Sequence, residues 1–83
     1  MNQDQIFRGG VYHGVDPKST REVILFTKQP SVNGAWPAGS VVYRPAGRHS
    51  EGARNASAAE LGYPGCFFMT IRAFARWARS RVG

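Results

Sequence analysis

Three arginines near the C-terminus form the clearest pattern for binding chemistry in this sequence. Arg72, Arg76 and Arg79 are spaced i, i+4 and i+7, and in a helix they fall within about 60° of one another. Like charges at this spacing repel one another unless an anion lies among them. A guanidinium group binds phosphate or carboxylate through two parallel hydrogen bonds, which Lys cannot do. The pattern predicts an anion-facing surface, and an ordinary solvated helix face is the alternative.

The distribution of charge supports the same hypothesis. Lys and Arg total 11 against 5 Asp and Glu, a net charge of +6. Residues 1–43 contribute +1 of this (4 bases less 3 acids), and residues 44–83 contribute +5 (7 arginines less 2 glutamates). An anionic partner is expected, namely nucleic acid, an acidic protein surface or anionic lipid. The alternative is an Arg-rich composition that reflects a GC-rich genome and keeps the protein soluble.

Four other residues are candidates for the same surface. Arg44, Arg48 and Arg54 extend it if the basic loop of residues 46–56 folds toward the helix. Trp36 lies in a Pro/Gly-rich loop directly before a proline, a setting typical of a surface aromatic. Aromatic rings interleaved with arginines can stack the bases of a single strand. For the remaining Tyr and Trp side chains, core packing is the main alternative.

No constellation for catalysis or metal binding is present. His13 and His49 have no third ligand at a recognisable spacing, so we expect no zinc site and two exposed or hydrogen-bonded histidines. Cys66 precedes Phe67 and is expected to be a small buried apolar residue. The carboxylates are scattered, and the glycines match no phosphate or dinucleotide loop. We therefore expect a non-enzymatic protein without a cofactor.

Short extended segments and one C-terminal helix are predicted along the chain. The strand predictions are residues 6–15, bent at glycines, then 21–28, 41–44 and 66–69. The run Val23–Phe26 is apolar on both faces, which is typical of a central strand. Residues 29–40 are predicted as a loop and 46–55 as a flexible basic loop. Ser57–Glu60 has the spacing of a capping box and predicts one helical turn.

The helix is predicted to begin after Thr70, which can cap it. A single apolar face predicts that it continues to residue 82; this face comprises Ile71, Phe74, Ala75, Ala78 and Val82. The predicted core comprises Val23, Ile24 or Leu25, Phe26, Val42, Phe67, Ile71 and Phe74. We also expect Tyr43 to be buried and Trp77 to lie at the edge of the apolar face.

Several short stretches resemble an uncharacterised family of short bacterial proteins thought to form SH3-like barrels. The matching stretches are Gly10–His13, Glu22–Ile24, Val41–Arg44 and Phe68–Met69 followed by Phe74. The likeness spans about half the chain, and the family's late aromatic-x-Arg-Pro stretch is replaced by Thr70–Ala73. The resemblance implies a small barrel and transfers no functional residues.

These observations predict one α+β domain over residues 1–83. We expect a small antiparallel bent sheet or partial SH3-like barrel of four to five strands, with a C-terminal amphipathic helix packed on it. No apolar run is long enough to span a membrane, and the polar start does not match a signal peptide. One cysteine cannot form an internal disulfide, so a soluble cytoplasmic protein is expected.

The predicted function is a non-catalytic module whose Arg-rich C-terminal surface binds nucleic acid. An alternative is a small inhibitor or adaptor, of the kind that mobile elements encode, that docks on an acidic protein surface. Docking of the C-terminal helix on a membrane surface is a third hypothesis, weakened because the core requires the helix's apolar face.

Overall fold

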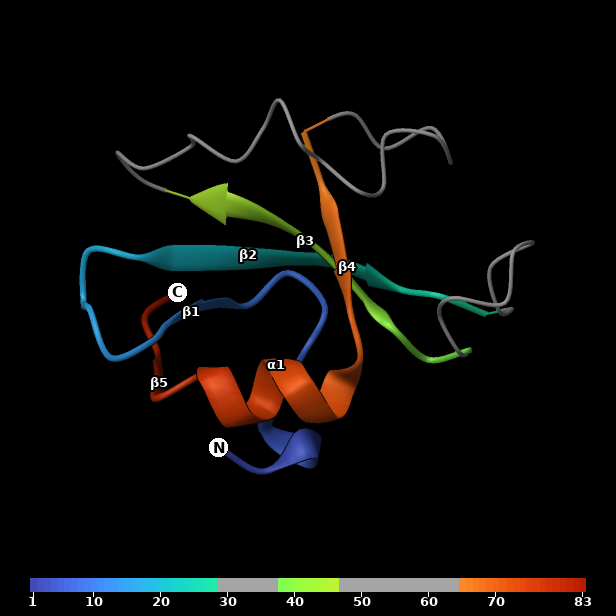
Figure 1. The fold of residues 1–83 in the computed structure, drawn as a ribbon, viewed down its shortest axis with the longest axis horizontal. Coiled ribbons are helices and arrows are strands. Elements are labelled where there is room, and N and C mark those ends of the chain that lie inside the picture. Colours follow the sequence, from blue (N-terminus) through green and yellow to red (C-terminus); the bar gives the residue numbers. More distant parts are fainter. Residues whose placement is uncertain (29–37, 47–64) are drawn as a thin grey trace.

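Five strands form one antiparallel sheet, and a short helix packs on one face of it (Figure 1). The computed structural model describes residues 1–28, 38–46 and 65–83. The elements in chain order are η1 (Gln3–Gln5, a 3-10 turn), β1 (Val11–His13), β2 (Thr20–Phe26), β3 (Val41–Ala46), β4 (Phe67–Met69), α1 (Ile71–Trp77) and β5 (Ser80–Arg81). The strand order β4-β3-β2-β1-β5 makes the sheet open. The prediction of a small α+β domain with four to five antiparallel strands and a helix near the C-terminus is confirmed, and the sheet is open where a partial barrel was the other expectation.

β2 is apolar on both faces because each face packs on its own hydrophobic cluster, and a bulge decides which residues face which cluster. Val23 pairs with Tyr43, but the next pair is Leu25 with Val42, so Ile24 is the extra residue of a bulge. Val23 and Tyr43 belong to the core cluster beneath the helix. Ile24 and Leu25 both pack on a second cluster, whose buried members are Val42, Cys66 and Phe68. Bulges also increase the local twist of a sheet.

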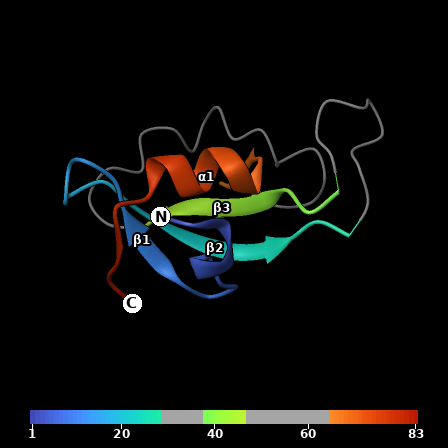
Figure 2. The ribbon, with the colours of Figure 1, turned by 90° about the horizontal axis from the view of Figure 1, so that it is seen from below.

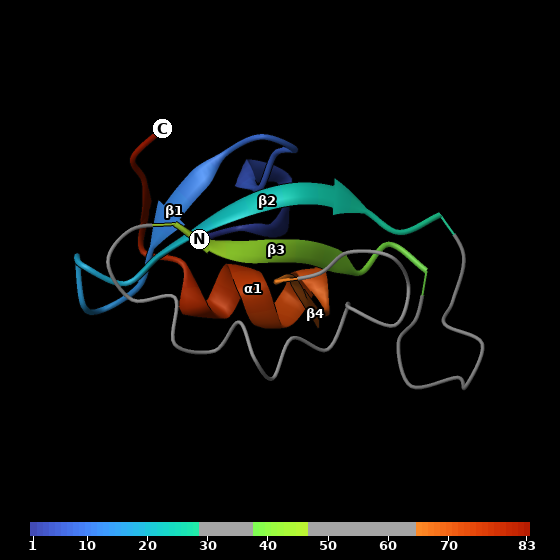
Figure 3. The same ribbon diagram turned by 90° about the horizontal axis from the view of Figure 1, so that it is seen from above.

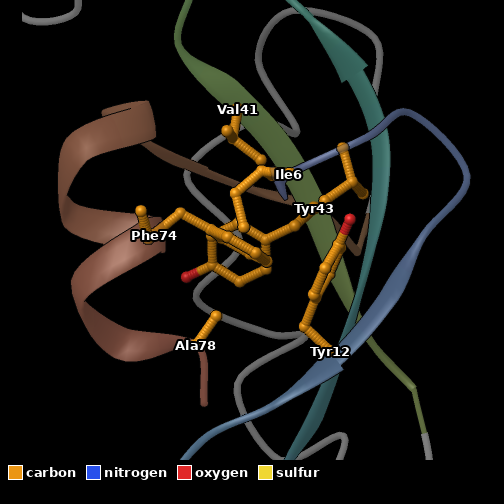
Figure 4. Close-up of a cluster of buried hydrophobic side chains, with 8 residues drawn as sticks. Ile6, Tyr12, Val41, Tyr43, Phe74 and Ala78 are labelled. Carbon is orange, nitrogen blue, oxygen red and sulfur yellow. The ribbon is translucent and has the colours of Figure 1, made fainter. Parts of the chain in front are cut away.

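The main core lies between α1 and the sheet (Figures 2 and 3). Tyr12 and Phe74 are completely buried there and meet edge to face, with their ring centroids 5.7 Å apart. Figure 4 shows these rings converging with Tyr43 and Val41. Tyr12 was one of the aromatic side chains for which core packing was the alternative to base stacking, and its burial favours the core. The Tyr12 hydroxyl is satisfied by the backbone, since it donates to the Gln5 carbonyl (3.0 Å) and accepts from the Phe7 N–H (2.7 Å).

Two glycines are required by close ring contacts in this core. A Cβ atom at Gly10 would lie 2.6 Å from the Tyr12 hydroxyl oxygen, and one at Gly14 would lie 2.6 Å from Nε1 of Trp77. Both distances are too short for carbon. The glycines that suggested only bends in the sequence therefore make room for Tyr12 and Trp77.

The first residues of the chain pack against α1. Ile6 is buried, and the amino group of Met1 donates to the carbonyls of Ala75 (2.9 Å) and Ala78 (3.1 Å). A positive charge at the C-terminal end of a helix interacts favourably with the helix dipole. This contact also satisfies carbonyls that the end of the helix leaves without intrahelical partners.

The predicted helix is correct in its start and wrong in its end. Thr70 caps it as predicted, because its hydroxyl accepts from the Ala73 N–H at 3.1 Å. The helix stops at Trp77, and Val82, expected on its buried face, is 56% exposed. The chain instead turns extended at Ala78 and forms β5 along β1. Backbone N–H groups after Ala78 donate to carbonyls of β1, such as that of His13, and no longer to carbonyls of the helix.

Other predictions are partly confirmed by the packing. Val23, Val42 and Phe74 are buried as expected, although Val42 belongs to the second cluster. Phe26, Phe67 and Ile71 are partly buried against the main core. β3 runs to Ala46, two residues beyond the predicted end of this strand at Arg44. Residues 29–37 and 47–64 lie outside the described residues, and with them most of the predicted loop 29–40, nearly all of the predicted basic loop 46–55 and the helical turn predicted at Ser57–Glu60. Among the described helices, none is long and apolar enough to cross a bilayer.

Candidate anion-binding surface

Arg72 and Arg76 lie on the outer side of α1, one helical turn apart, and both are exposed. The opposite side of the helix holds Phe74 and Ala75 in the core. This separation follows from the helical period, which places residues i and i+4 on one side. The structure therefore brings together two of the three arginines that were predicted to share a helix face.

Arg79 does not share that face, which corrects the sequence prediction. It follows the end of the helix, in the connection to β5, and its backbone N–H donates to the His13 carbonyl at 2.8 Å. Its side chain is exposed. Arg81 comes two residues later in β5 and is also exposed. An extended chain separates such residues by at most about 7 Å between Cα atoms, so Arg79 and Arg81 form a second basic pair beyond the helix.

These four arginines have no acidic side chain near them in sequence. Residues 65–83 contain no Asp or Glu. Within residues 1–28, 38–46 and 65–83 the single ion pair joins Arg44 to Glu22, so the four have no carboxylate partner in this part of the chain. The Nε of Arg81 donates to the Gly83 carbonyl at 2.9 Å. Most of the guanidinium donors of this surface therefore face solvent.

Arg44 lies elsewhere and is already paired. Its Nε donates to Oε1 of Glu22 at 2.7 Å, across the β2–β3 ladder. Tyr43, the preceding residue, faces the helix, so strand alternation places Arg44 on the opposite face of the sheet. Arg44 therefore does not share a face with Arg72 and Arg76, which corrects its expected placement, and its role in partner binding stays a prediction. The other predicted contacts, Arg48, Arg54 and Trp36, lie outside the described residues.

Arg21 is the least exposed arginine among the described residues, and no sequence pattern indicated this position. Its guanidinium carbon lies 4.1 Å from the Trp77 ring centroid and 4.8 Å from that of Tyr43. Its Nη1 also donates to the Met69 sulfur at 3.1 Å. Burial lowers the pKa of Arg21, and the interaction with Tyr43 partly offsets this. Only the tertiary packing reveals this position, because Arg21 is the second residue of an otherwise ordinary strand.

The two described residues that could have carried other chemistry have structural partners. Nδ1 of His13 lies 2.7 Å from the Gly14 carbonyl oxygen and therefore donates. Its Nε2 is hydrogen-bonded to the Ser80 hydroxyl at 2.6 Å, which confirms the prediction of a hydrogen-bonded histidine. Cys66 is buried as predicted, and burial raises the pKa of its thiol. The described residues contain no group of three or more His, Cys, Asp or Glu side chains that could hold a metal ion.

Comparison with known proteins found no match for this chain among protein-family models, curated protein sequences or solved structures.

Proposed function

We propose that this chain is a non-catalytic module that binds nucleic acid through its C-terminal arginines. The observation that carries the proposal is the set of exposed arginines without carboxylate partners in the described residues, namely Arg72, Arg76, Arg79 and Arg81. Free guanidinium groups in this number favour a ligand with repeated negative charges. A phosphate backbone has such charges at regular intervals.

In the proposed mode, the arginines bind phosphate oxygens and leave the bases to other contacts. Arg72 and Arg76 approach the backbone from the outer side of α1, and Arg79 and Arg81 bind phosphates further along the strand. Contacts of this kind position a nucleic acid but carry no direct sequence information. Affinity therefore depends weakly on sequence and falls steeply with salt, because each neutralised phosphate releases counterions.

The fold separates this binding surface from the residues that stabilise the domain. The core beneath α1 is formed by Phe74, Ala75 and Ala78 on the helix side, whereas Arg72, Arg76 and Arg79 are exposed. Substitutions on the exposed side of a helix usually change stability by less than about 0.5 kcal/mol. Charge reversal of the surface is therefore expected to change binding without unfolding the protein.

The test compares two triple variants of equal net charge. Arg72→Glu/Arg76→Glu/Arg79→Glu reverses the proposed surface, and Arg8→Glu/Lys18→Glu/Lys28→Glu reverses three exposed bases elsewhere. Binding to labelled 20-nucleotide single strands and duplexes is measured by fluorescence anisotropy at low salt. The first variant is expected to lose binding, and the control is expected to retain most of it.

Two results would refute the proposal. One is equal loss in both triple variants, which would show that only net charge matters. The other is no binding of the wild-type protein to either nucleic acid at low salt. That second result would favour the alternative of an inhibitor or adaptor docking on an acidic protein surface, for which a pulldown from the native host is the direct assay.

A further inference from the structure

Phe7 is the one exposed aromatic side chain among the described residues. Its side chain is 53% exposed, whereas every other described Phe, Tyr or Trp is buried or partly buried. Tyr12, five residues later, is fully buried, so an aromatic ring in this part of the chain can reach the core. Phe7 is instead left largely in solvent, where its ring is accessible for stacking.

The backbone holds Phe7 in place although its ring is exposed. The N–H of Phe7 donates to the Tyr12 hydroxyl at 2.7 Å, and its carbonyl accepts from the Gly10 N–H at 3.0 Å. The preceding residue, Ile6, is anchored in the main core. An exposed ring on a fixed backbone loses little conformational freedom when a ligand stacks on it.

An arginine accompanies the ring. The guanidinium carbon of Arg81 lies 5.7 Å from the Phe7 ring centroid. Only its Nε is hydrogen-bonded within the described chain, to the Gly83 carbonyl, so its terminal nitrogens can reach a phosphate. Arg79, two residues earlier, continues the basic surface toward the helix. Ring and cations thus combine a stacking group with charges that bind a nucleic-acid backbone.

We infer that Phe7 stacks an unpaired base while Arg81 binds the neighbouring phosphate, so that the preferred ligand is single-stranded nucleic acid. This inference rests on the proposed function and specifies its ligand. Charge complementarity selects this occupant, because the ring lies beside the Arg81 guanidinium. A duplex keeps its bases stacked on one another and cannot offer one to Phe7, whereas single-strand binding proteins use aromatic rings in this way.

The experiment replaces the ring while keeping an apolar side chain. Wild type, Phe7→Leu and Phe7→Trp are titrated with a labelled 20-nucleotide single strand and with the duplex of the same sequence, at one fixed salt concentration. Loss of one stacked base weakens binding roughly 5- to 150-fold. Phe7→Leu is expected to show a loss in this range on the single strand and almost none on the duplex. Phe7→Trp is expected to bind the single strand at least as well as wild type.

Each outcome separates this inference from the function on which it rests. If Phe7→Leu binds the single strand like wild type while the Arg72/Arg76/Arg79 charge reversal abolishes binding, stacking is refuted and the nucleic-acid function stands. Equal losses on strand and duplex also refute stacking. If the wild-type protein binds neither ligand, the proposed function fails and the inference fails with it. Thermal melting of each variant checks the fold, and Phe7→Trp keeps the test valid if Phe7→Leu melts early.

Discussion

The Arg21 guanidinium lies over the Trp77 ring, 4.1 Å from its centroid, and so links β2 to the last residue of α1. The same group lies 4.8 Å from the Tyr43 ring centroid on β3. A cation over an aromatic face is attracted by the ring's electron distribution, and more strongly where water is partly excluded. Burial by itself disfavours the charge, which is why the pKa of Arg21 is lowered. The rings offset part of this cost and make Arg21 a structural residue.

Replacing Arg21 should therefore destabilise the fold although the residue is charged. Arg21→Ala removes two cation–π contacts and the packing of the arginine stem, and should lower the free energy of unfolding by about 1–3 kcal/mol. Arg21→Lys should recover only part of this, because an ammonium group does not stack on rings as a guanidinium does. Urea denaturation measures both values. Arg8→Ala, at an exposed position, is the control, and an equal effect of the Arg8 and Arg21 substitutions would contradict this role.

Phe74 is predicted to be the most costly single truncation in the helix. It is completely buried and contacts the rings of Tyr12, Tyr43 and Trp77. Phe74→Ala should lower the free energy of unfolding by about 3–5 kcal/mol, the usual range for a core Phe. Ala73→Gly, one position away and only partly buried, should cost about 1 kcal/mol from helix propensity alone. Thermal melting distinguishes the two, and a Phe74→Ala protein that melts within a degree or two of wild type would disprove the packing.

Stability should fall in alkaline solution because two protonated groups are buried. Burial raises the pKa of Cys66 above its ordinary value of 9.0 and that of Tyr43 above 10.0. The folded state thus binds these protons more tightly than the unfolded state, so this stability is complete below about pH 9 and is lost as pH rises through the folded pKa values. Urea titrations between about pH 8 and pH 10.5 should show the decline. In Cys66→Ala, the stability should decline less steeply in the lower part of this pH range than in wild type. An unchanged decline would show that the thiol is not shielded from solvent.

Cys66 should also react slowly with thiol reagents in the folded protein, because the thiolate is the nucleophile and its formation is disfavoured by burial. The matched measurement is labelling in urea, where the thiol is accessible. Equally rapid labelling in both conditions would contradict the buried position.

The sequence predicted the elements with regular patterns and missed those that depend on tertiary contacts. Alternating and continuous apolar runs indicated β2 and β3, and the Thr70 cap indicated the start of α1. The end of α1 could not be predicted because Val82 fits the helical period of the buried face. What ends the helix is the free edge of β1, whose carbonyls at Val11 and His13 accept hydrogen bonds from the last residues. No local signal describes that edge.

The candidate site was predictable to a similar extent. Composition identified the arginines, and helical spacing paired Arg72 with Arg76. Their separation from Arg44 depends on strand alternation and on the ladder partner Glu22, which lies 22 positions away in sequence. The exposure of Phe7 was also not predictable, because an apolar residue beside Ile6 is expected to be buried.

The pairing of Arg44 provides a final prediction about binding. Each arginine that contacts a phosphate adds about 0.9 to the slope of log affinity against log salt on duplex, and about 0.7 on single strands. Arg76→Ala should reduce the slope by about that amount, because Arg76 is exposed and has no carboxylate partner in the described chain. Arg44→Ala should change it less, because Glu22 holds the Arg44 guanidinium at 2.7 Å on the other face of the sheet. Anisotropy titrations at four or more salt concentrations give both slopes. If Arg44→Ala reduces the salt slope more than Arg76→Ala does, the nucleic acid binds the opposite face of the sheet and not the surface at α1.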